Sequence, residues 1–425
     1  MNSLQGKKLL VLAGNSVHEK IVRAAKDLGV YTIVTDYLPV EQSPAKLIAD
    51  EYWMLSTGDI DAVVEKCRQE KVDGVLTFCI DTVQFHYLEI CTKLGVPCYG
   101  TRRQFEIMTN KRLFKDYCKA HGVGTIPEYT LDDIDNIRAD FPVLVKPSDS
   151  RGSRGQTVCH DKDEVPAAIA FAKSESKDGG YLIERYMQGA QDMSFAYIVI
   201  GGVPYLIKIG DRYLGKQDDN LDKQQMATLL PSRFAEDYRK QAEKKVIEMI
   251  RSLGMSFGPV FMQGFYDNGE VYMYDPGLRF PGSDFDIVLK AATGFDSMKS
   301  FVKFALTGAS DSREGNPSGV YDYGGKYCLL LSVSARPGKI GKLEGMEKIK
   351  SLPSVFSAFY YHHVGDVIPA SGDIRQRVAE FCCLLPDIDS VSHFVSLVYE
   401  TLSIEDEQGN DMIVSKVETL CQPIK

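Results

Sequence analysis

Residues 141–155 of the 425-residue chain read FPVLVKPSDSRGSRG, an apolar run that ends in Lys146 and continues into a loop of serine, arginine and glycine. The apolar run predicts a buried strand, and the glycines let successive backbone N–H groups turn toward one anion. Lys146, Arg151 and Arg154 can supply compensating charge. The stretch therefore predicts a phosphate-covering loop, although taken alone it fits a flexible surface hairpin equally well. The order GxxxxGK[ST] is missing, which argues against a P-loop NTPase.

The first hundred residues alternate strand and helix signals, which predicts a parallel α/β sheet. Expected strands lie at 9–13, 31–35 and 72–77, and expected helices at 17–28, 60–70 and 83–94. Gly14-Asn15-Ser16 follows the first strand, where such sheets bind ligands. Because the full GxGxxG fingerprint is absent, a plain tight turn is the better reading of these three residues.

The sequence pattern changes after Arg102, which indicates a second domain. A basic helix is expected at 110–121, followed by two helix-breaking stretches, Gly122-Val123-Gly124 and Ile126-Pro127. A long helix is expected at 234–252. Asp267-Asn268-Gly269 predicts a tight hairpin between strands 260–266 and 271–275. Further strands are expected at 142–146, 156–159, 181–185, 194–200 and 204–209, with a helix at 165–173.

Residues 182–189, LIERYMQG, indicate a strand that leaves the core and bends. Backbone carbonyl and N–H groups of such a segment can bind the edge of an adenine ring. Asp192 could then accept the ribose hydroxyls. A surface strand end with salt bridges is the alternative.

Gln263 and Asp275 stand twelve positions apart on the two strands of the expected hairpin, so they are predicted to face one cavity. Mg²⁺ prefers a few oxygen ligands completed by phosphate and water, and Arg279 could brace a transferred phosphoryl group. Out of context, an Asp-Pro-Gly sequence is simply a turn.

Taken in order, these motifs resemble those of the ATP-grasp superfamily, and the resemblance covers the whole sequence. It implies an N-terminal parallel α/β domain (residues 1–105) and a central ATP-grasp domain (106–310). The central domain would comprise a lid-bearing α+β subdomain (106–180) and a core α+β subdomain (181–310). A C-terminal α+β segment (311–425) would follow. Ala292-Thr293-Gly294-Phe295-Asp296 also matches a stretch common in the family.

The resemblance also assigns roles to residues. The two phosphate-contacting lysines would be Lys111 and Lys146. The lid would be Arg151, Gly152, Ser153, Arg154 and Gly155. The adenine-binding hinge would be Glu184, Arg185, Tyr186 and Met187, with Asp192 on the ribose. The metal ligands would be Gln263 and Asp275, and the catalytic arginines Arg279 and Arg336.

The chain departs from the family at the metal motif, where Asp275-Pro276-Gly277-Leu278-Arg279 replaces Glu-x-Asn-x-Arg. Glycine has no side chain to offer a metal, so Gly277 removes a ligand of the second ion. Asp284, Asp286 or water could compensate, and the number of Mg²⁺ ions, one or two, stays open. An arginine that caps a strand end is at least as good a reading of Arg336.

The function implied is an ADP-forming ligase of carbon–nitrogen bonds. ATP would phosphorylate a small-molecule carboxylate, and an amine would displace phosphate from the acylphosphate. Two alternatives remain: an ATP-binding module with weakened or lost ligase activity, and a bicarbonate-using carboxylase.

Composition and charge limit the partners and the cellular location that can be expected. The formal net charge of 49 − 58 = −9 argues against nucleic acid as a partner. Ten cysteines show no metal-ligand spacing and are expected to be reduced thiols. No signal peptide and no membrane-spanning stretch is recognised, so a cytoplasmic protein is expected. A homodimer is one admissible assembly, but the sequence does not fix the oligomeric state.

Overall fold

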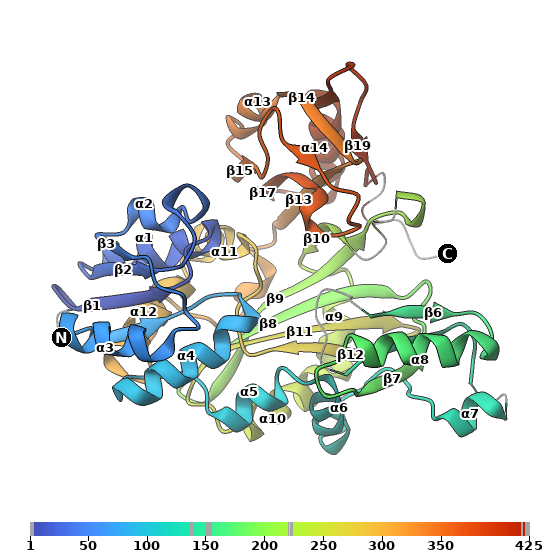
Figure 1. The fold of residues 1–425 in the computed structure, drawn as a ribbon, viewed down its shortest axis with the longest axis horizontal. Helices are drawn as coiled ribbons and strands as arrows, with labels where there is room; N and C mark the ends of the chain where they lie inside the picture. Colours follow the sequence, from blue (N-terminus) through green and yellow to red (C-terminus); the bar gives the residue numbers. More distant parts are fainter. Residues whose placement is uncertain are drawn as a thin grey trace.

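A computed structural model describes residues 4–136, 139–148, 155–219, 221, 224–417 and 420. Its strands form a parallel N-terminal sheet, a small sheet in the expected lid-bearing subdomain, a large antiparallel sheet that reaches into the C-terminal segment, and a further small sheet within that segment (Figure 1). Across the described ranges, no helix combines the length and apolar character needed to cross a bilayer.

The N-terminal sheet confirms the expected parallel α/β domain. Its strand order is β3 (Glu51–Trp53), β2 (Tyr31–Thr35), β1 (Lys8–Leu12) and β4 (Gly74–Leu76), and all the pairs are parallel. The connecting helices are α1 (Glu19–Asp27), α2 (Ala45–Ile48), α3 (Ile60–Glu70) and α4 (Asp81–Leu94).

The turn after β1 is tight. A Cβ atom at Gly14 would lie 2.1 Å from the Ser43 Oγ atom, and the Gly14 N–H donates to the Asp36 carboxylate at 3.0 Å. Glycine is therefore required here for close packing.

The expected lid-bearing subdomain carries its own sheet and its own small hydrophobic core. The strand order is β6 (Thr157–Cys159), β5 (Val143–Pro147) and β7 (Tyr181–Arg185), accompanied by α7 (Leu131–Asp135) and α8 (Val165–Ser174). Strand β7 opens the expected core subdomain in sequence, yet it pairs with β5 and so belongs to the lid sheet.

The large sheet has the order β12-β11-β8-β9-β10-β13-β17-β15, with β19 paired to β13. Its first five strands come from the central region and the others from the C-terminal segment, so the expected boundary at 310 lies between strands of one sheet. The bounds are β8 (Gln191–Ile200), β9 (Val203–Leu214), β10 (Gln225–Leu230), β11 (Phe257–Asp267), β12 (Glu270–Gly277), β13 (Tyr327–Ala335), β15 (Val355–Tyr360), β17 (Arg377–Leu385) and β19 (Ile413–Val414).

Helices tie the parts together. The single helix expected at 234–252 is broken at Ala242 into α9 (Ala235–Gln241) and α10 (Glu243–Ser252). Helix α9 packs against β12, whereas α10 packs against β9. The others are α5 (Arg102–Ile107), α6 (Lys111–Ala120), α11 (Phe285–Thr293) and α12 (Ser297–Thr307). Helix α12 packs on α1, β1 and β4, so the end of the central region returns to the N-terminal sheet (Figure 1).

The remaining C-terminal elements lie beside β13, β15 and β17 at the top of Figure 1. They are β14 (Gly338–Glu344), β16 (Val367–Ile368) and β18 (Ser403–Asp406), which form a small sheet of the order β16-β14-β18, with helices α13 (Met346–Lys350) and α14 (Ile388–Thr401). They enclose a second hydrophobic core with β13 and β17.

Candidate functional site

Lys111 and Asp275 meet although they are 164 positions apart in sequence. Lys111 is the first residue of α6. The side-chain oxygen of the N-cap residue Asn110 accepts hydrogen bonds from the backbone N–H groups of Arg112 and Leu113. Helix α6 packs on β12, and the Lys111 ammonium lies 3.0 Å from an Asp275 carboxylate oxygen. The N-terminus of the helix thus delivers the first predicted phosphate-binding lysine to the predicted metal ligand.

Gln263 of β11 and Asp275 of β12 are directly opposed in the β11–β12 ladder. On the other side of β11, Gln263 pairs with Ser194 of β8. Paired residues of an antiparallel ladder point to the same face. The hairpin turn has Asn268 and Gly269 at φ 49° and 89°, as the Asn-Gly sequence predicts. The two predicted metal ligands therefore offer an amide and a carboxylate oxygen on one face of the large sheet.

Three cations act on the Asp275 carboxyl. Burial alone would raise its pKa, but Lys111, Arg279 and Lys146 together hold that pKa below its ordinary value. All three are residues that the sequence assigned to phosphate or phosphoryl binding. Cations from three segments that converge on one carboxylate suit a site that receives a polyphosphate with its metal.

Glu184 lies fully buried between two lysines. Its carboxylate oxygens are 2.5 Å from the Lys146 ammonium and 2.5 Å from the Lys115 ammonium. Burial would raise the pKa of Glu184, but the two lysines outweigh that effect and lower it. Burial lowers the pKa of Lys146, and Glu184 opposes this shift. The Glu184 side chain thus orients Lys146.

The rest of the hinge is held from both sides. Arg185 donates to Asp267 at 2.7 Å, and the Tyr186 N–H donates to the Pro142 carbonyl at 3.2 Å. Within the described ranges, the Met187 N–H has no hydrogen-bond acceptor. This donor stands at the bend where the predicted adenine edge would lie.

Asp192 is already engaged. Arg212 of β9 donates to it at 2.7 Å and Tyr274 of β12 at 3.1 Å, and Arg212 also donates to the Tyr274 hydroxyl. Burial raises the pKa of Asp192 while Arg212 opposes the rise. A ribose hydroxyl bound here would share a carboxylate that two protein donors orient.

Arg279 is anchored by the N-terminal domain. Its Nε lies 2.5 Å from a carboxylate oxygen of Asp81, the first residue of α4. Its guanidinium lies over the Phe261 ring at 5.2 Å. A Cβ atom at Gly277 would lie 3.2 Å from the Arg279 Cγ atom and 3.4 Å from its Nε. The glycine that departs from the family pattern therefore makes room for Arg279 to fold back over β12.

Gly155 closes the lid loop at φ 73°, and a Cβ atom there would lie 2.6 Å from Pro147. The other predicted lid residues, Arg151, Gly152, Ser153 and Arg154, lie outside the described residues. Arg336 follows β13, is exposed and donates to the Asp411 carbonyl. None of the described site residues makes a contact with it.

Several polar residues of this region had no role in the sequence analysis. Lys20 of α1 lies 3.1 Å from Asp284 and 2.6 Å from Asp286, which ties the N-terminal domain to the segment after Arg279. Lys115, Arg212 and Asp81 join the site in the same way. Only Lys115 carried a local signal, since it lies one helical turn after Lys111.

Lys208 of β9 is a buried lysine that rests over the Phe285 ring at 5.2 Å. Burial lowers its pKa from 10.5 to about 7. Between these two values the unfolded protein holds a proton that the folded protein lacks, so stability must rise with pH across that window.

We therefore expect Lys208→Met to be more stable than the wild type at pH 7, by an amount that shrinks toward pH 10. Lys208 contributes at most about 1.4 kcal/mol per pH unit to the pH dependence of the free energy of unfolding, and the substitution removes that contribution. Urea unfolding of both proteins at pH 7, 8.5 and 10 measures it. Parallel stability curves for the two proteins would contradict the expectation.

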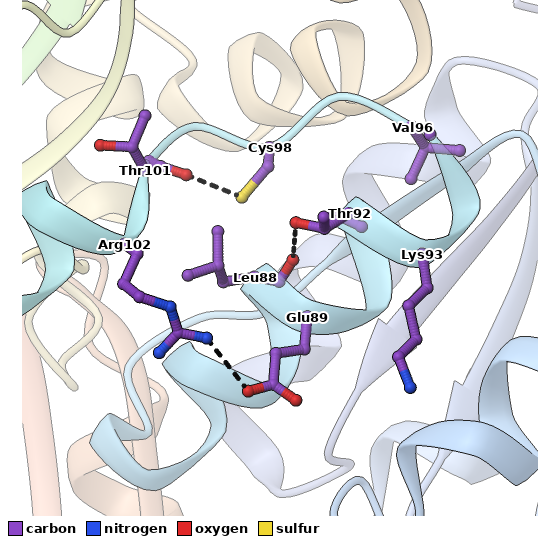
Figure 2. Close-up of a pocket in the computed structure, with 11 residues that line it drawn as sticks. Leu88, Glu89, Thr92, Lys93, Val96, Cys98, Thr101 and Arg102 are labelled. Atoms are coloured by element: carbon purple, nitrogen blue, oxygen red, sulfur yellow. Dashed lines mark hydrogen bonds and ion pairs between the residues drawn. The ribbon is translucent and has the colours of Figure 1, made fainter.

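A separate hollow of about 550 Å³ lies between α4 and the start of α5, and Figure 2 shows it. Its polar groups bind one another: Arg102 donates to Glu89 at 3.3 Å and Thr92 to the Leu88 carbonyl at 2.7 Å. It contains none of the site residues described above.

Three comparisons with known proteins bear on this geometry. The family model described as "Carbamoyl-phosphate synthase L chain, ATP binding domain" matches residues 111–307. The 2-oxoglutarate carboxylase small subunit of Hydrogenobacter thermophilus is 22% identical over 329 residues, which are 70% of this chain and 66% of the relative. The chain thus spans slightly less than two thirds of that relative's length.

Two solved structures resemble almost the full length of the protein. The L-amino acid ligase of Bacillus licheniformis aligns with a TM-score of 0.75 at 18% identity, covering 95% of this chain and 99% of the ligase. The phosphoribosylglycinamide synthetase of Anaerococcus prevotii aligns with a TM-score of 0.73 at 16% identity, covering 95% and 100%. At such identities the likeness establishes the fold.

Proposed function

We propose that the protein is an ATP-grasp, ADP-forming ligase that activates a carboxylate as an acylphosphate and transfers the acyl group to an amine. The match of residues 111–307 to the ATP-binding domain of the carbamoyl-phosphate synthase large chain supports this proposal. The observation that carries the proposal is the arrangement around Asp275. Three cations from three segments, Lys111, Lys146 and Arg279, act on this one carboxylate. Such a constellation suits phosphoryl transfer, which needs positioning and charge stabilisation rather than a side-chain nucleophile.

Each residue then has a task. Lys111 and Lys146 would hold the phosphates, and Lys111 would exchange the Asp275 carboxylate for phosphate oxygens. The Met187 N–H would bind the adenine edge and Asp192 the ribose. Arg279, fixed by Asp81, would brace the transferred phosphoryl group from the side of the N-terminal domain.

Gln263 and Asp275 would hold magnesium. Both offer hard oxygen ligands, and Mg²⁺ takes one or two protein ligands together with phosphates and water. No group of three or more histidine, cysteine or acidic side chains with metal-binding geometry occurs in the described part of the protein. When bound, magnesium would neutralise charge on the transferred phosphoryl group.

A release assay tests the proposal. Purified protein with MgATP is given carboxylic acids crossed with amines, and ADP and the amide product are quantified. We expect ADP release that requires both partners and an equal yield of amide. ADP release driven by bicarbonate alone would instead establish a carboxylase.

Gly277 favours a second candidate, an ATP-binding module with weak or no ligase activity. The Arg279 side chain occupies the space in which a metal-binding side chain at this position would lie. Calorimetry that detects MgATP binding, combined with no ADP release across the whole panel, would decide for this candidate.

A further inference from the structure

Glu380 of β17 is a buried acid that the proposed chemistry leaves without a task; its exposed fraction is 7%. One of its oxygens, Oε2, accepts three hydrogen bonds. The donors are Arg377 at 2.7 Å, Tyr361 at 3.1 Å and Ser332 at 3.5 Å. The carboxylate is thus held in one orientation by donors from β17, from β13 and from the segment just after β15.

The other oxygen, Oε1, accepts no hydrogen bond from any residue that the structure describes. Oε1 keeps some contact with solvent, and an oriented carboxylate with one accessible oxygen has the form of a binding site. What binds at Oε1 must bring a donor or a positive charge.

Strand pairing places Glu380 on the site face of the large sheet. Glu380 pairs with Ser332, and two residues along β13 Leu330 pairs with Thr228 of β10. Thr228 in turn pairs with Arg212 of β9.

Arg212 is ion-paired with Asp192 of β8, two residues before Ser194. Ser194 pairs with Gln263, which pairs with Asp275. Paired residues on neighbouring strands, and residues two apart on one strand, point to the same face of a sheet. The ion pair between Arg212 and Asp192 links the two parts of this path, so Glu380 and Asp275 lie on the same face.

The segment after Arg279 lies next to Glu380. Two residues further along β17, Cys382 donates to the Asp284 carbonyl at 3.5 Å. Burial raises the pKa of Glu380; Arg377 opposes the rise, and the negative charge of Asp284 adds to it. Asp284 is itself paired with Lys20, which also contacts Asp286. Three acids therefore share this place with two cations, Arg377 and Lys20, and the remaining negative charge favours a cation and disfavours an anionic ligand.

We propose that Glu380 Oε1 receives an ammonium group of the second substrate. The second substrate then binds as a protonated amine and not as bicarbonate. Its ammonium must lose a proton before the nitrogen attacks the acylphosphate, and the Glu380 carboxylate that holds it can accept that proton. The proposal rests on the ligase function proposed above and specifies its acceptor. Glu380 selects and positions this substrate, while the phosphoryl-transfer residues stay as described.

Binding tests the proposal without requiring turnover. Ligand-observed NMR with MgADP present compares glycine, β-alanine and 1,5-diaminopentane with their hydroxy counterparts. We expect at least one amine to bind the wild type about tenfold or more tightly than its hydroxy counterpart. In Glu380→Gln this preference is expected to fall below twofold.

Two further variants keep the result interpretable. Tyr361→Phe removes one donor to Oε2 at a half-exposed position and should weaken the amine preference severalfold in a folded protein. Glu405→Gln removes an acid elsewhere in the C-terminal segment, where it pairs with Lys342, and should leave the preference intact.

An amine preference that persists in Glu380→Gln would overturn the inference, as would no preference in the wild type or displacement of the amine by Mg²⁺ alone. Failure of the ligase proposal has a different signature. It would appear as missing ADP release in the wild type, whatever the amine binding shows.

Discussion

Asp275→Asn should lower acid- and amine-dependent ADP release at least about a hundredfold, since loss of metal-site groups costs at least that order of affinity or activity. Asparagine keeps the size and one oxygen of the side chain but removes the charge. The three cations that now act on Asp275 would lose their common counter-charge, and the Gln263 amide would remain as the partner of a far weaker metal site.

A magnesium titration of ADP release measures this effect, and the half-saturating Mg²⁺ concentration should rise together with the loss of rate. Glu270→Gln is the matched control. It removes an exposed acid at the other end of the same strand, whose bond is to Tyr272. Wild-type turnover by Asp275→Asn at ordinary Mg²⁺ would remove Asp275 from the metal site.

Lys146→Ala should lower ATP turnover by about two to three orders of magnitude, the range found when one preorganised donor to a developing charge is lost. The structure adds a cost that the sequence did not reveal. Lys146 is one of two lysines that neutralise buried Glu184. Breaking a buried ion pair costs about 3–5 kcal/mol, and the remaining lysine should keep the loss near or below the lower end.

Lys115→Ala separates the two effects. It removes the other lysine from Glu184 but takes away no predicted phosphate ligand. Both variants should melt below the wild type, and at a temperature where both are folded only Lys146→Ala should lack ADP release. Equal turnover in the two variants would show that Lys146 acts only through stability.

The fold was largely readable in advance because it depends on local patterns. The alternation of strand and helix signals before residue 100 predicted the parallel sheet, and Asn268-Gly269 predicted the hairpin that aligns Gln263 with Asp275. Period and turn chemistry are properties of neighbouring residues, so a single sequence reveals them.

Boundaries were harder to read, because pairing between distant strands leaves no local trace. Strand β7 joins the lid sheet across the expected boundary at 180, and β13 extends the large sheet across the boundary at 310. Helix α12 returns to the N-terminal sheet. Such contacts depend on which faces remain to be buried once the elements have formed.

The candidate site divides in the same way. The sequence by itself determined the residue types and their order: two lysines, a glycine-rich loop, a bending strand and two oxygen ligands spaced by one hairpin. Only the tertiary structure decided their partners, because the charge that settles a buried acid comes from whichever segment packs beside it. It placed Lys111 on Asp275, Lys115 and Lys146 on Glu184, and Asp81 on Arg279. Among the described residues, it also left Oε1 of Glu380 without a hydrogen-bond donor.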